Sequence, residues 1–356
     1  MSMVAEAPAA AKLIVGVDTH KHLHVAVAID SFGARLGSLT VAADRAGYAA
    51  LEAWAVSLSP TPAFGIEGTG SYGAGLASHL RRCGHRVVEV NRGDRRTRRG
   101  NGKSDTIDAE LAARAVRSGQ ASAVPKTADG ASEMLRQVKI ARDTAVKSRM
   151  QAIIALKCLI VNAPPELREL LDPLADKKLI DRCAALRPGP IDAPLAAAKH
   201  ALRSLARRWL DLAAEIAGHD RILDQLTRAS NPTLRDGFGM GPDTAAEMLI
   251  VFGDNPDRIH SEAAFAKLCG TAPVPASSGQ TSRHRLSWGG HRQANAALYR
   301  VVIVRMRFHQ PTIDYVTRRT QEGLTKRDII RCLKRFLARE IYRRVMTDHA
   351  TATASP

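Results

Sequence analysis

The sequence lacks an apolar run long enough to cross a membrane. A transmembrane helix needs about 20 consecutive apolar residues, whereas the longest purely apolar stretches, such as Val301–Val304, are as short as a β-strand. No basic segment precedes an apolar one near the beginning of the chain, so we expect no secretory signal. These absences predict a cytoplasmic protein that is not embedded in a membrane.

Cysteines are few and scattered. The chain of 356 residues has five, and no two of them form a Cys-x-x-Cys pair. A disulfide framework or a zinc site recognisable from sequence has closely and regularly spaced ligands. The spacing therefore predicts reduced thiols and neither a zinc site nor a disulfide framework.

Acidic residues are in short supply relative to basic ones. Lys and Arg number 52 against 35 Asp and Glu, which gives a formal net charge of +17. Hydrophobic residues make up 45% and charged residues 24%, as is usual for a globular protein. A positive surplus of this size indicates a polyanionic partner, most commonly nucleic acid.

The first 125 residues predict an α/β domain. Alternating apolar residues between 13 and 43 predict three strands in a meander, with a turn at Asp30–Gly33. Helical and strand patterns then alternate, which is typical of α/β architecture. The predicted elements are a helix at 45–58, a strand at 63–66, a helix at 72–82, a strand at 86–90 and a helix at 105–116.

The remainder of the chain predicts helices. Residues 126–230 contain a helical segment at about 131–161 and, from Leu202 to Leu226, an apolar seam with the 3-4 spacing of a coiled coil. This pattern predicts a long helical hairpin or a dimerisation arm. Residues 231–356 begin with a glycine turn before a helix, continue through an irregular stretch at 272–290, and end in basic helices at about 291–346. The segment from Arg300 to Arg344 contains 13 Lys or Arg residues but only 4 Asp or Glu, so we expect phosphate binding there.

Four acidic residues are candidates for a metal site. Asp18 ends the first strand, and Glu67 lies between glycines on another strand. Asp105 and Asp108 are three residues apart at a helix start and so share one face. Each has an ordinary explanation, as a strand end or a helix cap. Together, four carboxylates suit Mg²⁺ or Mn²⁺, and two such ions about 4 Å apart assist phosphoryl displacement. RNase H-like nucleases likewise begin with a meander that carries the first Asp.

Basic residues lie between Glu67 and Asp105. This segment fits a nucleic acid lying across a metal site, and it does not fit a small neutral substrate. The candidate contacts are Arg95, Arg96, Arg98, Arg99 and Lys103.

Five motifs, in this order, resemble transposases of the insertion-sequence-110 family, which are bridge-RNA-guided recombinases related to Piv-type DNA invertases. The motifs are GVDTHKHLHVAVAID, GIEGTGSYG, KSDTIDAELAARA, GTAPVPASSGQT and GGHRQANAAL. The resemblance covers about residues 13–345. It implies a RuvC-like domain of RNase H fold at 1–125, a helical coiled-coil linker at 126–230, and a mostly helical transposase domain at 231–356.

The resemblance also implies the roles of individual residues. Asp18, Glu67, Asp105 and Asp108 match the DEDD acids that bind Mg²⁺ or Mn²⁺. Either Ser277 or Ser278 matches the nucleophilic serine, and we favour Ser277 because the family's serine lies two residues before the glycine of its motif, here Gly279. A phosphoserine link to DNA would store the bond energy for rejoining. The arginines that would steady the phosphate charge are Arg283, Arg285 and Arg292.

The implied partners are donor and target DNA, a structured guide RNA, and further copies of the chain in a dimer or tetramer with a composite site. The implied location is the bacterial cytoplasm, at the nucleoid. Two alternatives remain open: a hydrolytic RuvC-like nuclease, and a basic architectural protein whose acids are structural. We interpret His20, His22 and His24, which alternate in the first motif, as a solvated strand face rather than metal ligands.

Overall fold

The computed structural model describes residues 13–91, 104–277, 279–280, 284–285, 287 and 289–354. The chain separates into two compact units, Met1–Thr127 and Ala128–Pro356. Each unit has its own hydrophobic core.

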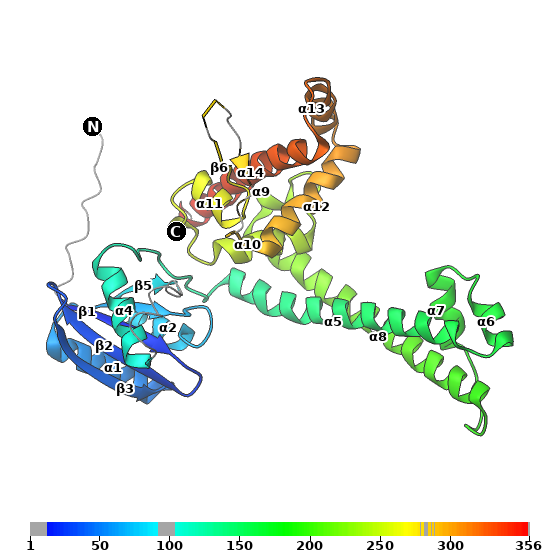
Figure 1. The fold of residues 1–356 in the computed structure, drawn as a ribbon, viewed down its shortest axis with the longest axis horizontal. Coiled ribbons are helices and arrows are strands. Elements are labelled where there is room, and N and C mark those ends of the chain that lie inside the picture. Colours follow the sequence, from blue (N-terminus) through cyan, green and yellow to red (C-terminus); the bar gives the residue numbers. More distant parts are fainter. Residues whose placement is uncertain are drawn as a thin grey trace. The chain divides into compact units, whose positions relative to one another are not determined.

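The first unit contains a five-stranded mixed sheet in the order β3-β2-β1-β4-β5 (Figure 1). Strands β1, β2 and β3 form the predicted antiparallel meander, and β4 and β5 continue from β1 in parallel. This order and these directions are those of an RNase H-like domain, so the fold predicted for this part is confirmed. The strands are β1 Leu13–Thr19, β2 Leu23–Asp30, β3 Arg35–Ala42, β4 Ala63–Glu67 and β5 Arg86–Val90.

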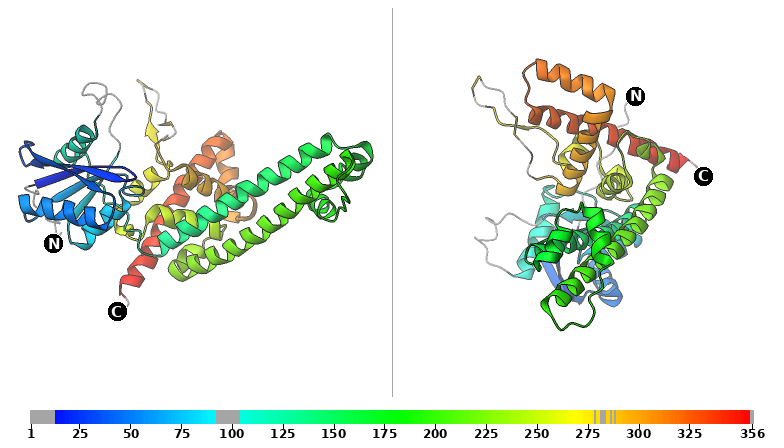
Figure 2. Two further views of the ribbon diagram at one scale, coloured as in Figure 1. Left: turned by 90° about the horizontal axis from the view of Figure 1, so that it is seen from below. Right: turned by 90° about the vertical axis from the view of Figure 1, so that its right-hand side faces the viewer.

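Helices cover both faces of this sheet (Figure 2). Helices α1, Arg45–Leu58, and α2, Ala74–Arg82, pack on one face, and α4, Asp105–Arg117, packs on the other. Side chains alternate along a strand, so Val15 and Val17 of β1 point to the first core and Ile14 to the second. Coverage on both sides explains why the central strands are apolar at nearly every position.

A long helical hairpin begins the second unit. Helices α5, Ala131–Val161, and α8, Pro194–Ser230, run side by side, with α6, Pro165–Leu171, and α7, Asp176–Ala184, between them in sequence (Figure 1). The pair is antiparallel: Arg142 Nε lies 2.6 Å from Asp220 Oδ1, and the Arg149 guanidinium lies 5.3 Å from the Trp209 ring centre. The predicted hairpin is therefore confirmed, and its coiled-coil character stays a prediction.

The rest of the second unit is mostly helical, as predicted. Its elements are α9 Pro232–Arg235, α10 Pro242–Phe252, the 3-10 turn η1 Pro256–Arg258, α11 Glu262–Leu268, β6 Val274–Pro275, β7 His284–Arg285, α12 Arg292–Phe308, α13 Gln310–Gln321 and α14 Lys326–Ala354. Helix α10 is buried along most of its length and contributes to the largest hydrophobic core. Within the described residues, no helix is both long and apolar enough to cross a bilayer.

Candidate functional site

Two of the four candidate acids lie at neighbouring strand ends. Strands β1 and β4 are parallel, and their register pairs Val17 with Ile66. The next residues along the two strands are Asp18 and Glu67, so their side chains emerge beside one another on the face of the sheet opposite to those of Val17 and Ile66. The Thr19 hydroxyl donates a hydrogen bond of 2.9 Å to the Glu67 carbonyl and ties these two ends together.

Helix α4 brings the other two acids to the same place. Its N-cap Ser104 accepts a hydrogen bond from a backbone N–H of the first turn, which also carries Asp105 and Asp108. The helix packs closely on β1 at Gly16, where an added Cβ would lie 1.9 Å from the Ala109 carbonyl oxygen. The missing side chain thus lets the helix start approach the strand ends.

The carboxylates affect one another electrostatically. Asp18 is buried, with 8% of its surface exposed. This burial raises the pKa of the Asp18 carboxyl above its ordinary value; the charges of Asp108 and Asp105 raise it further, whereas the nearby imidazole of His20 lowers it. The His20 Nε2 atom lies 3.2 Å from Asp18 Oδ2 and 3.5 Å from Asp105 Oδ2. The acids thus create a negative potential that favours a bound cation.

The donor set fits a hard divalent cation. Asp18 and Asp105 offer oxygens that, with His20 Nε2, all lie within 4.8 Å of one another, and Glu67 and Asp108 add carboxylates at the same sheet end. Carboxylate oxygens are the ligands that Mg²⁺ and Mn²⁺ prefer. The Asp105 side chain is about half exposed, at 52%, so this end of the sheet is open to a substrate.

The expectation that the three alternating histidines form a solvated face is wrong for His24. For His20 it misses the contacts of the ring with two acidic side chains. His24 is fully buried, and its ring stacks on Tyr48 with the ring centres 5.7 Å apart. It points to the core under α1 because alternate residues of β2 face that core. His22 is exposed as expected. The spacing alone did not distinguish His20 from the other two histidines: of its two acidic neighbours, Asp18 is two residues away in sequence, but Asp105 comes from a distant helix.

Several predicted residues lie outside the described residues. They are Ser278, Arg283 and the basic segment Arg95, Arg96, Arg98, Arg99 and Lys103.

Ser277 lies in the second unit, in the connection between two short strands. Strands β6 and β7 pair antiparallel, with Val274 opposite Arg285 and Pro275 opposite His284. The sequence pattern did not predict this pair, because two-residue strands leave no periodicity to detect. Ser277 follows β6 by two residues and is exposed.

Two adjoining cavities beside this strand pair are lined by basic side chains. One of about 640 Å³ includes Arg285, and one of about 320 Å³ includes Arg292. Lys334 lines both; it is buried, and its Nζ donates a hydrogen bond of 2.7 Å to Asn295 Oδ1. Burial lowers the pKa of the Lys334 ammonium, and the positive charge of Arg331 lowers it further. The structure therefore brings the predicted Arg285 and Arg292 to neighbouring walls of one basic depression.

Two arginines that line the larger cavity have unsatisfied hydrogen-bond donors. Arg331 Nε and Arg335 Nη1 are buried and make no hydrogen bond to any described residue. Buried guanidinium N–H groups without acceptors are costly, and phosphate oxygens satisfy them well. Both belong to the basic stretch that the sequence predicts to bind phosphates, and only the fold, which places them beside His284 and Arg285 around one cavity, separates them from the other bases.

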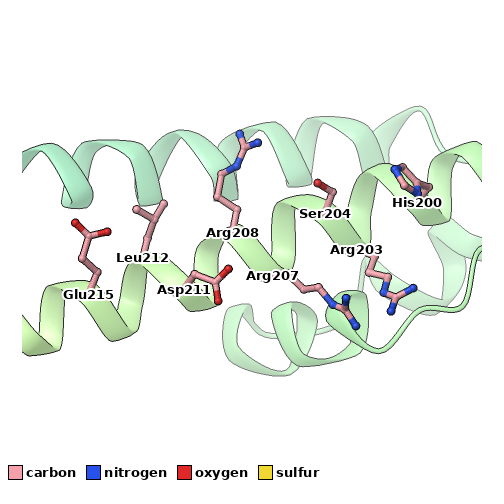
Figure 3. Close-up of a pocket in the computed structure, with 8 residues that line it drawn as sticks. All are labelled: His200, Arg203, Ser204, Arg207, Arg208, Asp211, Leu212 and Glu215. Carbon is pink, nitrogen blue, oxygen red and sulfur yellow. The ribbon is translucent and has the colours of Figure 1, made fainter.

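A further hollow lies along the hairpin, on α8 (Figure 3). It measures about 590 Å³ and belongs to none of the predicted sites. In Figure 3, Arg203 and Arg207 point to one side of the helix and Arg208 to the other. The lining residues are His200, Arg203, Ser204, Arg207, Arg208, Asp211, Leu212 and Glu215.

Comparison with protein families identifies both units. Residues 15–165 match the DEDD model of IS110 elements, described as a transposase. Residues 231–317 match a model described as the transposase IS116/IS110/IS902 family. A search of curated proteins finds no significant match. The two matches follow one another along the chain and together cover well over half of it.

Proposed function

Because the chain belongs to the IS110 family of transposases, we propose that it recombines DNA through a phosphoserine intermediate, assisted by divalent ions at its DEDD acids. The family implies an enzyme that cuts and rejoins DNA; the intermediate and the ions are our proposal. The observation that supports it best is the convergence of Asp18, Glu67, Asp105 and Asp108 at one end of the sheet, from two strands and a helix.

The four acids would hold Mg²⁺ or Mn²⁺. Such ions polarise phosphoryl oxygens and stabilise the charge that develops on them. The protein's own contribution is to fix the carboxylates in advance, through the register of β1 and β4 and the close packing of α4 on Gly16. Preorganisation of this kind reduces the reorganisation needed during reaction.

In the cleavage step, we propose that Ser277 Oγ attacks a DNA phosphorus. The Oγ–P bond forms, the bond from phosphorus to the leaving nucleotide oxygen breaks, the serine proton passes to a base, and the leaving oxygen gains a proton. Reversal with a different DNA end rejoins the strand, so no high-energy cofactor is consumed. Arg285, Arg292 and Arg283 would contact the phosphates, and the guanidinium groups of Arg331 and Arg335, which line the larger cavity, would add positive charge.

We further propose the partners that the family resemblance implied. These are donor and target DNA, a structured guide RNA, and other copies of the chain in a dimer or tetramer that completes the site. The basic segment from Arg95 to Lys103 would contact nucleic acid beside the acids. The protein would act in the bacterial cytoplasm at the nucleoid, with residues 126–230 as a linking or dimerising arm between the catalytic parts, 1–125 and 231–356.

The test combines the protein, its candidate RNA, Mg²⁺ and both DNA sites, and measures covalent protein–DNA adducts on denaturing gels. We expect adducts with the unaltered protein and with Ser230→Ala, whose hydroxyl bonds the Leu226 carbonyl at the end of α8. Ser277→Ala should form none. Asp18→Asn and Glu67→Gln should reduce adduct formation by at least 100-fold, because each removes a ligand charge.

The alternative outcomes distinguish other mechanisms. Adducts that persist in Ser277→Ala and vanish in Ser278→Ala would move the nucleophile by one residue. Free DNA ends without any adduct, insensitive to both serine substitutions, would indicate a hydrolytic nuclease. DNA binding with no cleavage under any condition, unchanged in Asp18→Asn, would indicate an architectural protein and refute the proposal.

A further inference from the structure

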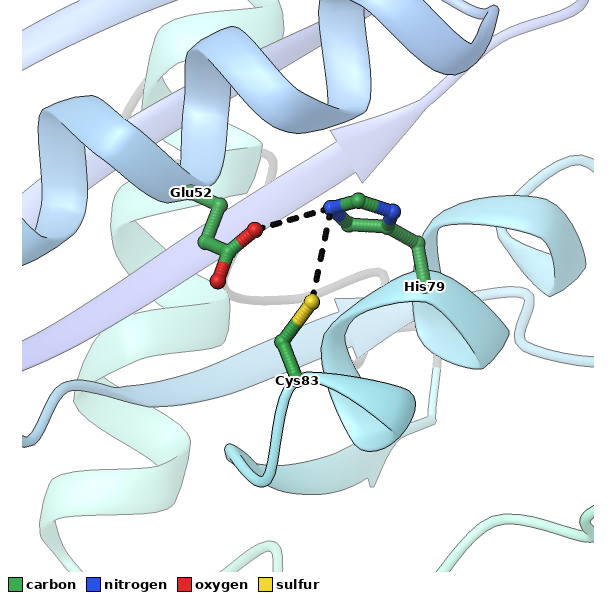
Figure 4. A group of neighbouring side chains, drawn as sticks. All are labelled: Glu52, His79 and Cys83. Atoms are coloured by element: carbon green, nitrogen blue, oxygen red, sulfur yellow. Dashed lines mark hydrogen bonds and ion pairs between the residues drawn. The ribbon is translucent and has the colours of Figure 1, made fainter.

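A second group of side chains that could hold a metal ion lies on the other face of the sheet, between α1 and α2 (Figure 4). Glu52 comes from the middle of α1, and His79 and Cys83 come from the end of α2 and its C-cap. His79 and Cys83 are four residues apart, so successive helical turns place them on the same side. The site is therefore built from three residues whose relative positions depend only on how two helices pack.

The distances show how closely the three groups approach. His79 Nε2 lies 2.9 Å from Glu52 Oε2 and 3.8 Å from Cys83 Sγ. One nitrogen, one sulfur and one carboxylate oxygen thus lie within 4.8 Å of one another. In a tetrahedral zinc site, with bonds of about 2.0–2.3 Å, neighbouring ligand atoms are roughly 3.3–3.8 Å apart. The present positions need only small side-chain adjustments to match.

The Glu52 carboxylate accepts hydrogen bonds from both neighbours, the His79 imidazole and the Cys83 thiol. The two donors therefore converge on one acceptor. A cation at this point would take the place of the thiol proton, because the imidazole, the carboxylate and a deprotonated thiol can all direct lone pairs to it.

A fourth residue holds the carboxylate in place. His85 Nε2 lies 3.0 Å from Glu52 Oε1, the oxygen that faces away from His79. Its ring packs edge-on against Phe64, with the ring centres 5.4 Å apart, and its side chain is only 11% exposed. Partners of this kind orient ligands and commonly contribute 10- to 100-fold in metal affinity.

We propose that Glu52, His79 and Cys83 bind one zinc-type divalent cation, distinct from the ions at the DEDD acids, and that this ion ties the end of α2 to α1. Sulfur and nitrogen ligands select Zn²⁺ over Mg²⁺ or Mn²⁺. Binding releases the thiol proton to solvent, and water completes the coordination. The ion would join two helices that cover the sheet face away from the acids.

Cobalt titration of the full-length protein tests this proposal. Protein without a histidine tag is stripped with a chelator and titrated with CoCl₂, and the thiolate-to-cobalt absorption band reports a sulfur ligand. We expect the band in the unaltered protein, displaced by ZnCl₂, and in Asp105→Asn, which alters only the acid site. Cys158→Ser, which removes an exposed cysteine of the second unit, should also retain it.

The ligand variants decide the outcome. Cys83→Ser should lose the band, and Glu52→Gln and His79→Gln should weaken cobalt binding at least tenfold with circular dichroism unchanged. His85→Gln should weaken binding 10- to 100-fold while keeping the band, because His85 orients a ligand without binding the ion. A band that is absent from the unaltered protein, or that persists in Cys83→Ser, would overturn the proposal. If Cys83→Ser does not fold, the test is alkylation of Cys83 in the unaltered protein, which bound zinc should slow. Equal labelling of Cys83 with and without ZnCl₂ would overturn the proposal.

Discussion

Substitution of Gly16 by alanine should disable the acid cluster without touching any acid. A Cβ at this position would lie 1.9 Å from the Ala109 carbonyl oxygen and 2.4 Å from the Ala113 backbone nitrogen. Real Cβ contacts below 3.0 Å are essentially never found, so α4 must move away from β1 by about 1 Å or more. The helix carries Asp105 and Asp108 with it.

The size of the effect follows from this displacement. A misplacement of about 1 Å in a catalytic arrangement costs on the order of 100-fold in rate. Overpacking a core typically costs about 1–3 kcal/mol of folding stability, and the upper part of that range applies here because both obstructing atoms are backbone. We expect Gly16→Ala to remain folded at 25 °C, with weaker Mn²⁺ binding and roughly 100-fold slower DNA cleavage.

Two other glycines of the same sheet supply controls. At Gly65 the nearest atom is a Val116 methyl at 2.6 Å, which can rotate, and the Ala112 carbonyl is at 3.1 Å, so we expect a smaller loss. At Gly37 the nearest atom is in Trp54 at 3.5 Å, an ordinary contact, so Gly37→Ala should behave like the unaltered protein. Mn²⁺ calorimetry, cleavage rates and urea unfolding measure the series. Equal Mn²⁺ affinity and cleavage in Gly16→Ala and Gly37→Ala would refute the reasoning.

Three further predictions concern the second unit. Lys139 is buried, with Nζ 2.5 Å from Asp243 Oδ1 and 3.6 Å from Glu247 Oε2. Lys139→Met removes a hydrogen bond to a charged group, while Asp243 keeps Arg142 and Arg300, so it should lower the free energy of unfolding in urea by about 1–3 kcal/mol; a loss no larger than that of the exposed Lys147→Met on the same helix would contradict this. Burial raises the pKa of Cys269 to about 12 and of Cys183 to about 11, so peptide mapping after alkylation at pH 8 should find the exposed Cys158 labelled and these two protected until unfolding. Burial raises the pKa of Glu340, but hydrogen bonds from Arg305 and Arg344 outweigh it and lower the pKa below 4.5 overall. The ionised carboxylate therefore stabilises the fold above that pH, and this stabilisation is lost as the pH falls through the lowered pKa. In Glu340→Gln, the free energy of unfolding should therefore decrease less steeply with falling pH.

The sequence predicted those elements whose boundaries are marked by local residue patterns. The strand at Arg86–Val90 and the helix at Ala131–Val161 have the predicted bounds, because an apolar period or a breaker marks both of their ends. The acids could be proposed from sequence for a similar reason: Asp18 interrupts an apolar strand, and Glu67 ends another. Both positions are visible without knowledge of the partner element.

Sites assembled from distant elements could not be predicted in this way. Lys334 lines the basic depression because the fold brings α14 to the same cavity as Arg285, and its sequence context is like that of the other bases around it. The scattered spacing of the cysteines does not reveal a site at Cys83, since only His79 is near it in sequence and Glu52 lies on another helix. Spacing rules for metal ligands detect sites within one segment, and they carry no information on how α1 packs against α2.

The two halves of the acid cluster are held by different forces, and this determines which mutations disturb it. Asp18 and Glu67 are fixed by the β1–β4 ladder, where a slip of one residue would turn every side chain to the opposite face. Both faces of the sheet are covered by helices, so such a slip is strongly opposed by the packing of both cores. Asp105 and Asp108 depend instead on the position of α4, which small-residue contacts set against β1. Ion affinity should therefore respond most to substitutions that displace α4 and least to conservative changes within the strands, which makes the helix–strand contact at Gly16 the most sensitive point of the site.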